Sequence, residues 1–386
     1  MNKYMIGAAA AALFLLSGCS ADEVSNSSDE FTLDQLSNVE IKLSARNGSI
    51  SSANATRAAI IGDTDADIDS LGVFGLARAI QGINQSANAI TWFAESENWS
   101  GCILNNVAAN KVGHDINWAE EGAAYFYPPT QFYSYDFYGY YPYVENEDLV
   151  YDATSVKANY EIDGTQDLIW GRATSDADYA YSAKYYRVNQ DPADPSMALQ
   201  HLLTRLVFTV VPGESVDGNG DYEMAALMSV DTLQIIDTYT HLTVNIADLN
   251  NIDLAPVDRV TLTDENTDTL TLCDVDAQGK NVPLQPLQVV APEPGVEPVP
   301  QQLGESIMLF PSDKYTIRIV LTMAAHDEQQ AQRFVSEVPL QLVAAGERFA
   351  QGTSYTVKIT VHGPQAVSLK AQLTPWDVED GPELEL

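Results

Sequence analysis

The stretch Tyr355-Thr356-Val357-Lys358-Ile359-Thr360-Val361-His362 alternates apolar and polar residues without a break. Successive side chains of a strand point to opposite faces, so a period of two predicts a strand with one buried face. No long stretch carries the helical period of 3.6. The same alternation recurs at 39–44, 205–211, 242–246, 315–321 and 367–373. Short strands separated by turns are typical of a β-sandwich, so we predict an all-β chain.

The chain of 386 residues is long enough for two domains once an export signal is removed. The proline-containing stretch 189–196 is a predicted connection between them, and 291–300 a predicted loop within the second. The division that we expect has four parts. They are a signal peptide at 1–18, a tether with a first strand at 19–57, an N-terminal sandwich at 58–197 and a C-terminal sandwich at 198–386.

The N-terminus has the features of an export signal. Lys3 is followed by an apolar run from Ile6 to Leu16, which is too short to span a bilayer. The run ends in Leu16-Ser17-Gly18-Cys19, which resembles the lipobox of bacterial lipoproteins. In such proteins the cysteine becomes the acylated N-terminus. We therefore predict a lipid anchor at Cys19 and a location at the outer membrane, exposed on the cell surface.

Composition and residue spacing argue against several functional classes. The formal net charge is −35, from 19 Lys and Arg against 54 Asp and Glu, so nucleic acid is not an expected partner. Beyond Cys19 there are two cysteines, Cys102 and Cys273, which imply no disulfide framework. The five histidines lack zinc-site spacing, and His201 is predicted to be structural. No catalytic motif is present, so we predict neither an enzyme nor a cofactor.

Two acidic runs are candidate calcium sites. Asp63, Asp65, Asp67 and Asp69 alternate, as do the acidic and amide residues of 217–221. Both runs lack the glycine and glutamate that an EF-type loop needs. Turn chemistry explains 217–221 equally well, so no metal site is predicted.

An aromatic block runs from Tyr125 to Tyr143. One interpretation is a surface for stacking sugars, together with Trp92, Trp99 and Trp118. The other is a strand whose rings fill the core while the tyrosine hydroxyls find partners. We favour the core, and the sugar-binding surface stays as the alternative.

Several motifs, taken in order, resemble the fimbrillin superfamily of Bacteroidales surface fimbriae. The N-terminal lipobox is followed by a strand and then by the motifs at 54–58 and 71–76. This order is similar to the family's N-terminus. The segment 137–143 resembles the family's aromatic strand, with Gly139 in place of the common alanine. The remaining matches are 199–208, 348–355 and 373–376.

This resemblance implies two transthyretin-like Greek-key β-sandwich domains in tandem. It also implies that an Arg-specific, trypsin-like protease removes the first strand of a lipid-anchored precursor. The strand of another fimbrial subunit then fills the groove. In this chain the removable strand carries Val39, Ile41 and Leu43, and Arg57 or Arg46 is the expected cut site. The expected donor residues are Val367, Leu369, Leu373, Leu384 and Leu386.

Two other functions remain open. A surface lipoprotein that binds glycans would use the aromatic residues named above. A tip or accessory fimbrial subunit would share the fold without the need to donate a strand.

Overall fold

The computed structural model describes residues 31–47, 68–79, 90–93, 101–129, 133–214, 222–326, 330–342, 348–363 and 366–374. Strands dominate these residues, and the all-β prediction is confirmed. None of the helices among them has the length and hydropathy needed to cross a bilayer. The helices, including the 3-10 helices η1–η3, are α1 (Leu33–Leu36), η1 (Asn146–Asp148), α2 (Ala183–Val188), α3 (Glu223–Ala226), η2 (Leu249–Asn251) and η3 (Pro256–Asp258).

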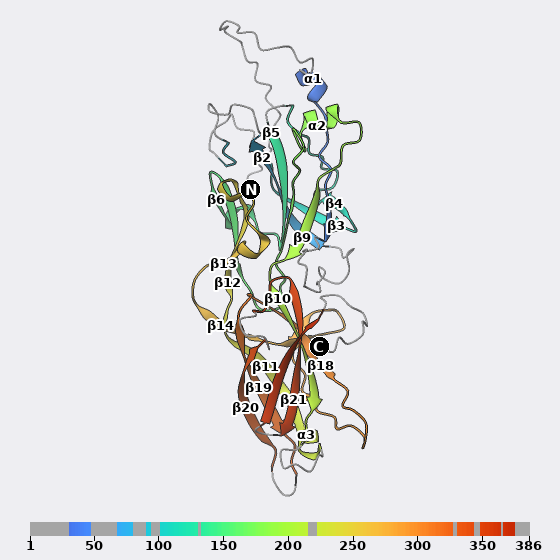
Figure 1. The fold of residues 1–386 in the computed structure, drawn as a ribbon, viewed down its shortest axis with the longest axis vertical. Helices are drawn as coiled ribbons and strands as arrows, with labels where there is room; N and C mark the ends of the chain where they lie inside the picture. The colour runs from blue at the N-terminus through green and yellow to red at the C-terminus, as the bar shows by residue number, and fades with distance from the viewer. Residues whose placement is uncertain are drawn as a thin grey trace, which may run out of the picture.

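The strands fall into two ends of an elongated molecule (Figure 1). At one end are β1 (Ser44–Asn47), β2 (Ile68–Ala79), β3 (Cys102–Val112), β4 (Asp115–Trp118), β5 (Tyr133–Tyr141), β6 (Leu149–Asp152), β7 (Ser155–Glu161), β8 (Ile169–Ala173), β9 (Ser196–His201), β12 (His241–Asp248) and β13 (Val260–Leu262). The others are β10 (Thr204–Pro212), β11 (Met228–Tyr239), β14 (Thr267–Thr271), β15 (Cys273–Val275), β16 (Asn281–Pro283), β17 (Leu287–Gln288), β18 (Gln301–Leu309), β19 (Lys314–Met323), β20 (Gln332–Gln341), β21 (Thr353–Gly363) and β22 (Ala366–Thr374).

A closed ring of strands forms the first end of the molecule, in the order β1-β4-β3-β2-β5-β8-β9. The ring closes because β1 pairs with β4 on one side and with β9 on the other. Its interior is filled by one core cluster, to which Leu71, Val73 and Phe137 belong. Side chains alternate between the two faces of these strands, apart from the irregularities between β2 and β3, so about half of them point into this core.

A four-stranded sheet, β13-β12-β7-β6, packs against the outside of the ring. Phe74, Tyr138 and Trp170 from the ring meet Leu242 and Val244 from the sheet in a second core cluster. The strands β2, β5 and β8 are therefore buried on both faces. This explains why the aromatic run of β5 shows no alternation between apolar and polar residues.

The second end of the molecule is a sandwich of two sheets. One has the order β18-β10-β21-β22, and the other contains β14-β11-β19-β20 with β17 beside β11. Phe208 and Val357 from the first sheet pack against Ile319 and Leu321 from the second. The alternating stretches found in the sequence supply these residues, because each places its apolar face inward.

The pairing of sheet strands crosses the expected boundary at residue 198. Strand β12 pairs with β7, and β13 pairs with β12, so 241–262 belongs with the first end of the molecule. The N-terminal end is therefore built from two separate parts of the chain. Alternation identifies a strand and its buried face, but it does not determine which strand lies beside it.

Candidate functional site

The short strand β1 closes the ring by joining two strands that do not otherwise meet. Its backbone runs parallel to β9, with Ser44 opposite Ser196, and antiparallel to β4. The Ser44 N–H donates to the carbonyl of Pro195 at 2.9 Å. The Ala45 N–H donates to the carbonyl of His114, also at 2.9 Å. Removal of β1 would expose one edge of β4 and one edge of β9.

The residues just before β1 are also paired, although they form no regular strand. The Ile41 N–H donates to the carbonyl of Tyr125 at 2.8 Å, and the Tyr127 N–H donates to the carbonyl of Val39 at 2.9 Å. Glu40 forms a β-bridge with Phe126. We call residues 36–47 the closing segment, because its backbone is held over most of this length.

Alternate side chains of the closing segment enter the ring core. Ile41 is 1% exposed, Leu43 is 6% exposed and Ala45 is fully buried. Glu40, Lys42 and Arg46 are exposed on the opposite face. The inward positions thus form a series of two large side chains and one small one, which defines the shape of the space that the segment fills.

The sequence located this segment but placed its regular strand a few residues too early. Ile41 and Leu43 are buried as expected, whereas Val39 is only partly buried. The regular strand is Ser44–Asn47, so Arg46 lies within β1 and not beyond the strand as expected. The alternating stretch 39–44 ends before Ala45, because the residues that follow are small or polar. The strand forms there because β4 and β9 supply backbone partners, which do not depend on side-chain type.

The helix α1 extends the hold on the closing segment, and the sequence analysis did not find it. Thr32 and Gln35 form a capping box at its start. Leu36 is 1% exposed in the same core cluster as Ile41. The Arg187 Nη2 from α2 donates to the carbonyl of Ser37 at 3.1 Å. The pattern of threonine followed three residues later by glutamine was the available signal.

The β5 part of the aromatic block lies in the core, which contradicts its use as a sugar-stacking surface, whereas Phe126 before it is 51% exposed. Tyr135 and Phe137 point into the ring, and Tyr138 and Tyr140 point toward the outer sheet. The Tyr140 hydroxyl donates to Asn106 Oδ1 at 2.6 Å. Burial raises the pKa of Tyr138 well above its ordinary value.

Among the tryptophans considered as sugar-binding residues, only Trp118 remains a candidate within the described residues. Trp92 is fully buried, and its Nε1 donates to the carbonyl of Ala77 at 2.8 Å. Trp118 is half-buried on β4, and Trp99 lies outside the described residues.

A group of buried charges ties the ring to the segment that follows β12. Asp136 is 1% exposed and accepts from Arg172 Nη2 at 2.7 Å, with Arg78 Nε 3.4 Å away. Arg259 stacks on Trp170 at 3.7 Å from the ring centre. Burial lowers the pKa of Arg259 to about 10. These groups pair with one another or with backbone carbonyls, so we assign them a structural role.

The remaining candidate positions that the structure describes form no metal-binding group. His201 is buried against Asp167, in line with a structural role. Within the described residues no three His, Cys, Asp or Glu side chains are grouped so as to hold a metal ion. Of the two acidic runs only Asp69 is described, on β2, and 63–67 and 217–221 lie outside.

The donor candidates fall on both sides of the last described residue. Val367, Leu369 and Leu373 lie on β22, which pairs antiparallel with β21 over its whole length. Leu384 and Leu386 lie outside the described residues, as do Cys19 and Arg57.

Comparison with known proteins gives a family match over most of the chain. The model of the fimbrillin-like family matches residues 56–376. The comparison with curated proteins found no match. A solved structure of a candidate cell adhesion protein from Bacteroides uniformis has 17% identity and a TM-score of 0.44, covering 87% of this chain and 98% of that chain.

Two further solved structures are similar over a comparable part of this chain. A candidate cell adhesion protein from Bacteroides ovatus has 14% identity and a TM-score of 0.43, covering 89% of this chain and 99% of that one. A fimbrial protein from Bacteroides ovatus has 13% identity and a TM-score of 0.35, covering 85% of this chain and 50% of that one. Because these TM-scores are below 0.5, the family is assigned from the family match alone.

Proposed function

Because this chain belongs to the fimbrillin-like family, we propose that it is a structural subunit of a cell-surface fimbrium. It is exported as a lipoprotein anchored through Cys19 in the outer membrane, and it supports adhesion. An Arg-specific protease removes the closing segment, and a strand of a neighbouring subunit takes its place. The subunit is structural and non-enzymatic.

The observation that carries this proposal is the double pairing of β1. A strand held between β4 and β9 leaves two open edges when it departs, so the vacancy accepts a strand with full backbone pairing. Leu36, Ile41 and Leu43 each contribute about 1.5–3 kcal/mol by burial. Three such side chains are comparable with the net stability of a domain, about 5–15 kcal/mol. An empty vacancy is therefore strongly disfavoured.

The trimmed subunit should stay folded before a partner strand binds, because one of its cores does not involve the closing segment. The outer faces of β2, β5 and β8 pack on the four-stranded sheet through a core cluster that contains no residue of the closing segment. That cluster retains Phe74, Tyr138 and Trp170 after the cut. Loss of the segment then damages the ring core and leaves the outer core in place.

Cleavage at Arg57 suits this scheme better than cleavage at Arg46. A protease must bind its substrate backbone in an extended form, and the Arg46 backbone is already paired with that of Ala198. Arg57 follows β1 and precedes β2, so a cut there frees the lipid, the tether and the closing segment together.

The donor is proposed from the shape of the vacancy. The inward positions 41, 43 and 45 hold Ile, Leu and Ala. The sequence of β22 has the same order at Val367, Leu369 and Ala371. The tail offers the pair Leu384 and Leu386. We therefore favour β22, which must then leave β21, and the tail remains the alternative donor.

Limited proteolysis followed by electrophoresis tests the proposed function. An Arg-specific protease should convert the chain to a product that begins at Ala58 and forms ladders on a mild-detergent gel. The Arg57→Gln variant should give no ladder under the same treatment. A trimmed product that remains a stable monomer would count against a stalk subunit and favour a tip or accessory subunit.

A further inference from the structure

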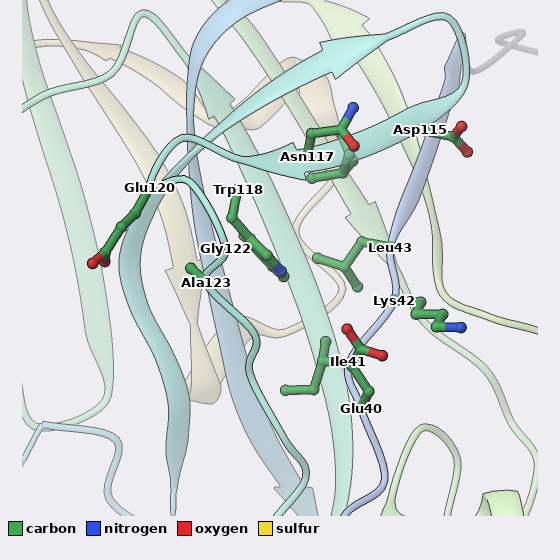
Figure 2. A pocket seen from close by; sticks show the side chains of 11 residues that line it. Glu40, Ile41, Lys42, Leu43, Asp115, Asn117, Trp118, Glu120, Gly122 and Ala123 are labelled. Atoms are coloured by element: carbon green, nitrogen blue, oxygen red, sulfur yellow. The ribbon is translucent and has the colours of Figure 1, made fainter.

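A hollow of about 400 Å³ lies between the closing segment and β4, with the turn that follows β4 at its other side. Its walls come from residues 40–43, from 115–118 and from Glu120, Gly122 and Ala123. Figure 2 shows the indole of Trp118 reaching from β4 toward Leu43 and Ile41. Small-ligand pockets occupy about 300–1,000 Å³, so the hollow is large enough for one small ligand.

The hollow exists because the neighbour of the closing segment changes partway along it. Tyr127 pairs with the segment at Val39 and Tyr125 pairs with it at Ile41, whereas Ile116 pairs with it at Leu43. The residues between these partners, 119–124, turn away from the segment. The alternation of strand hydrogen bonds directs the Ile41 carbonyl and the Leu43 N–H toward the gap. Neither group has a hydrogen bond to another described residue.

The wall opposite those backbone groups is aromatic. Trp118 is half-buried, and Tyr125 packs against it edge to face with the ring centres 4.9 Å apart. This contact holds the indole in position. The hollow therefore combines one flat apolar surface with one backbone donor and one backbone acceptor.

The charges around the hollow restrict its ligand. Glu40, Asp115 and Glu120 line it, against a single cation from Lys42. A ligand with a carboxylate or sulfate would meet net repulsion there. A neutral ligand with hydroxyl groups avoids that cost, because hydroxyls both donate and accept hydrogen bonds.

We propose that this hollow binds a single neutral hexose ring of a surface glycan. The apolar face of the sugar stacks on Trp118. Its hydroxyls donate to the Ile41 carbonyl and accept from the Leu43 N–H. An extended peptide would satisfy the same two backbone groups, but it has no ring to use the indole face. The proposal does not depend on strand exchange, since the hollow is present in the uncut chain.

Ligand-observed NMR on the full, uncut chain tests the site with glucose, galactose, mannose and glucuronate as probes. Saturation transfer to at least one neutral hexose is expected, with a dissociation constant in the millimolar range, and transfer to glucuronate should be at least tenfold weaker. Trp118→Ala should weaken hexose binding at least tenfold. Trp118→Tyr should keep most of it, because a flat ring remains.

Two further variants separate loss of the site from loss of the fold. Ala123→Arg fills the hollow without altering Trp118, and it should abolish hexose binding while the melting temperature stays within a few degrees. Phe126→Ala removes an exposed ring outside the hollow, and binding should not change. The proposal is overturned if no neutral hexose binds the wild-type chain, or if Ala123→Arg binds as well as wild type. Equal binding of glucuronate, or binding of a tri-alanine peptide in place of the sugars, also overturns it.

Discussion

Replacing Leu43 by alanine should increase the rate at which a protease cuts β1. Leu43 is 6% exposed and packs in the ring core. A buried Leu→Ala change costs about 2–5 kcal/mol. When the closing segment is released, residue 43 is in water in both variants, so this cost applies to the closed state. Each 1.4 kcal/mol is a factor of ten, so the released population should rise between about 30-fold and a few thousand-fold.

The assay follows cleavage after Arg46, whose backbone is accessible only when the segment is released. The Arg57→Gln background removes the competing cut, and mass spectrometry identifies the fragment that ends at Arg46. When opening and closing are fast compared with cleavage, the rate follows the released population. Lys42→Ala is the matched control, because Lys42 is the exposed neighbour of Leu43 and should change stability by less than about 0.5 kcal/mol. Equal cleavage rates for Leu43→Ala and Lys42→Ala would refute the claim that inward packing holds the segment.

Three further predictions concern the rest of the fold. Asp136→Ala should lower the free energy of unfolding by about 3–5 kcal/mol in a denaturant titration, because it removes the buried carboxylate that pairs with the partly buried Arg172. Asp253→Ala removes an exposed partner of the same arginine and should cost under about 1 kcal/mol. Burial raises the pKa of Cys102 to about 12, so its thiol is protonated at pH 8. Its alkylation should be on the order of 1,000-fold slower than that of an ordinary thiol and should accelerate as the pH rises toward 12. Fast labelling of Cys102 in the folded chain would argue against its burial. Gly72→Ala places a methyl carbon 2.2 Å from the Tyr140 ring and should lower the free energy of unfolding by about 1–3 kcal/mol. Gly139→Ala meets the flexible Met197 side chain instead and should lower it by less. A larger loss of stability for Gly139→Ala than for Gly72→Ala would contradict this reasoning.

The sequence predicts individual strands better than their partners. Alternation gave the buried faces of β10, β19 and β21, because each has one face in a single core. The buried aromatic block could be predicted from its ring content, but its two-sided burial could not. That burial depends on β12, which lies about 100 residues further along the chain and pairs with β7. Contacts between such distant segments leave no local periodicity.

The candidate site also contains some residues that the sequence predicts and others that it does not. Ile41 and Leu43 were found because they alternate with Glu40 and Lys42. The strand at Ser44–Asn47 was missed because small and polar residues resemble a connection, and there the backbone partners decide. The hollow beside Trp118 is a consequence of where β4 ends and the Tyr125 pairing begins, which no motif in the sequence records.

In the proposed fimbrium, β22 of one subunit replaces β1 of another in a defined register. With Val367, Leu369 and Ala371 in the places of Ile41, Leu43 and Ala45, Lys370 takes the place of Ser44. Ser44 lies opposite Asp115 of β4 in a pair without direct hydrogen bonds, for which Cα atoms are about 4.5 Å apart. That spacing permits a disulfide.

The most direct measurement therefore mixes an Asp115→Cys chain with a Lys370→Cys chain, cuts both after Arg57 under oxidising conditions and maps the cross-links by mass spectrometry. A disulfide between positions 115 and 370 of different subunits should appear only after cleavage, and Asp115→Cys with Gln372→Cys should give a much lower yield. If no such disulfide forms, or if it forms equally well in the uncut chains, β22 does not replace β1 in this register.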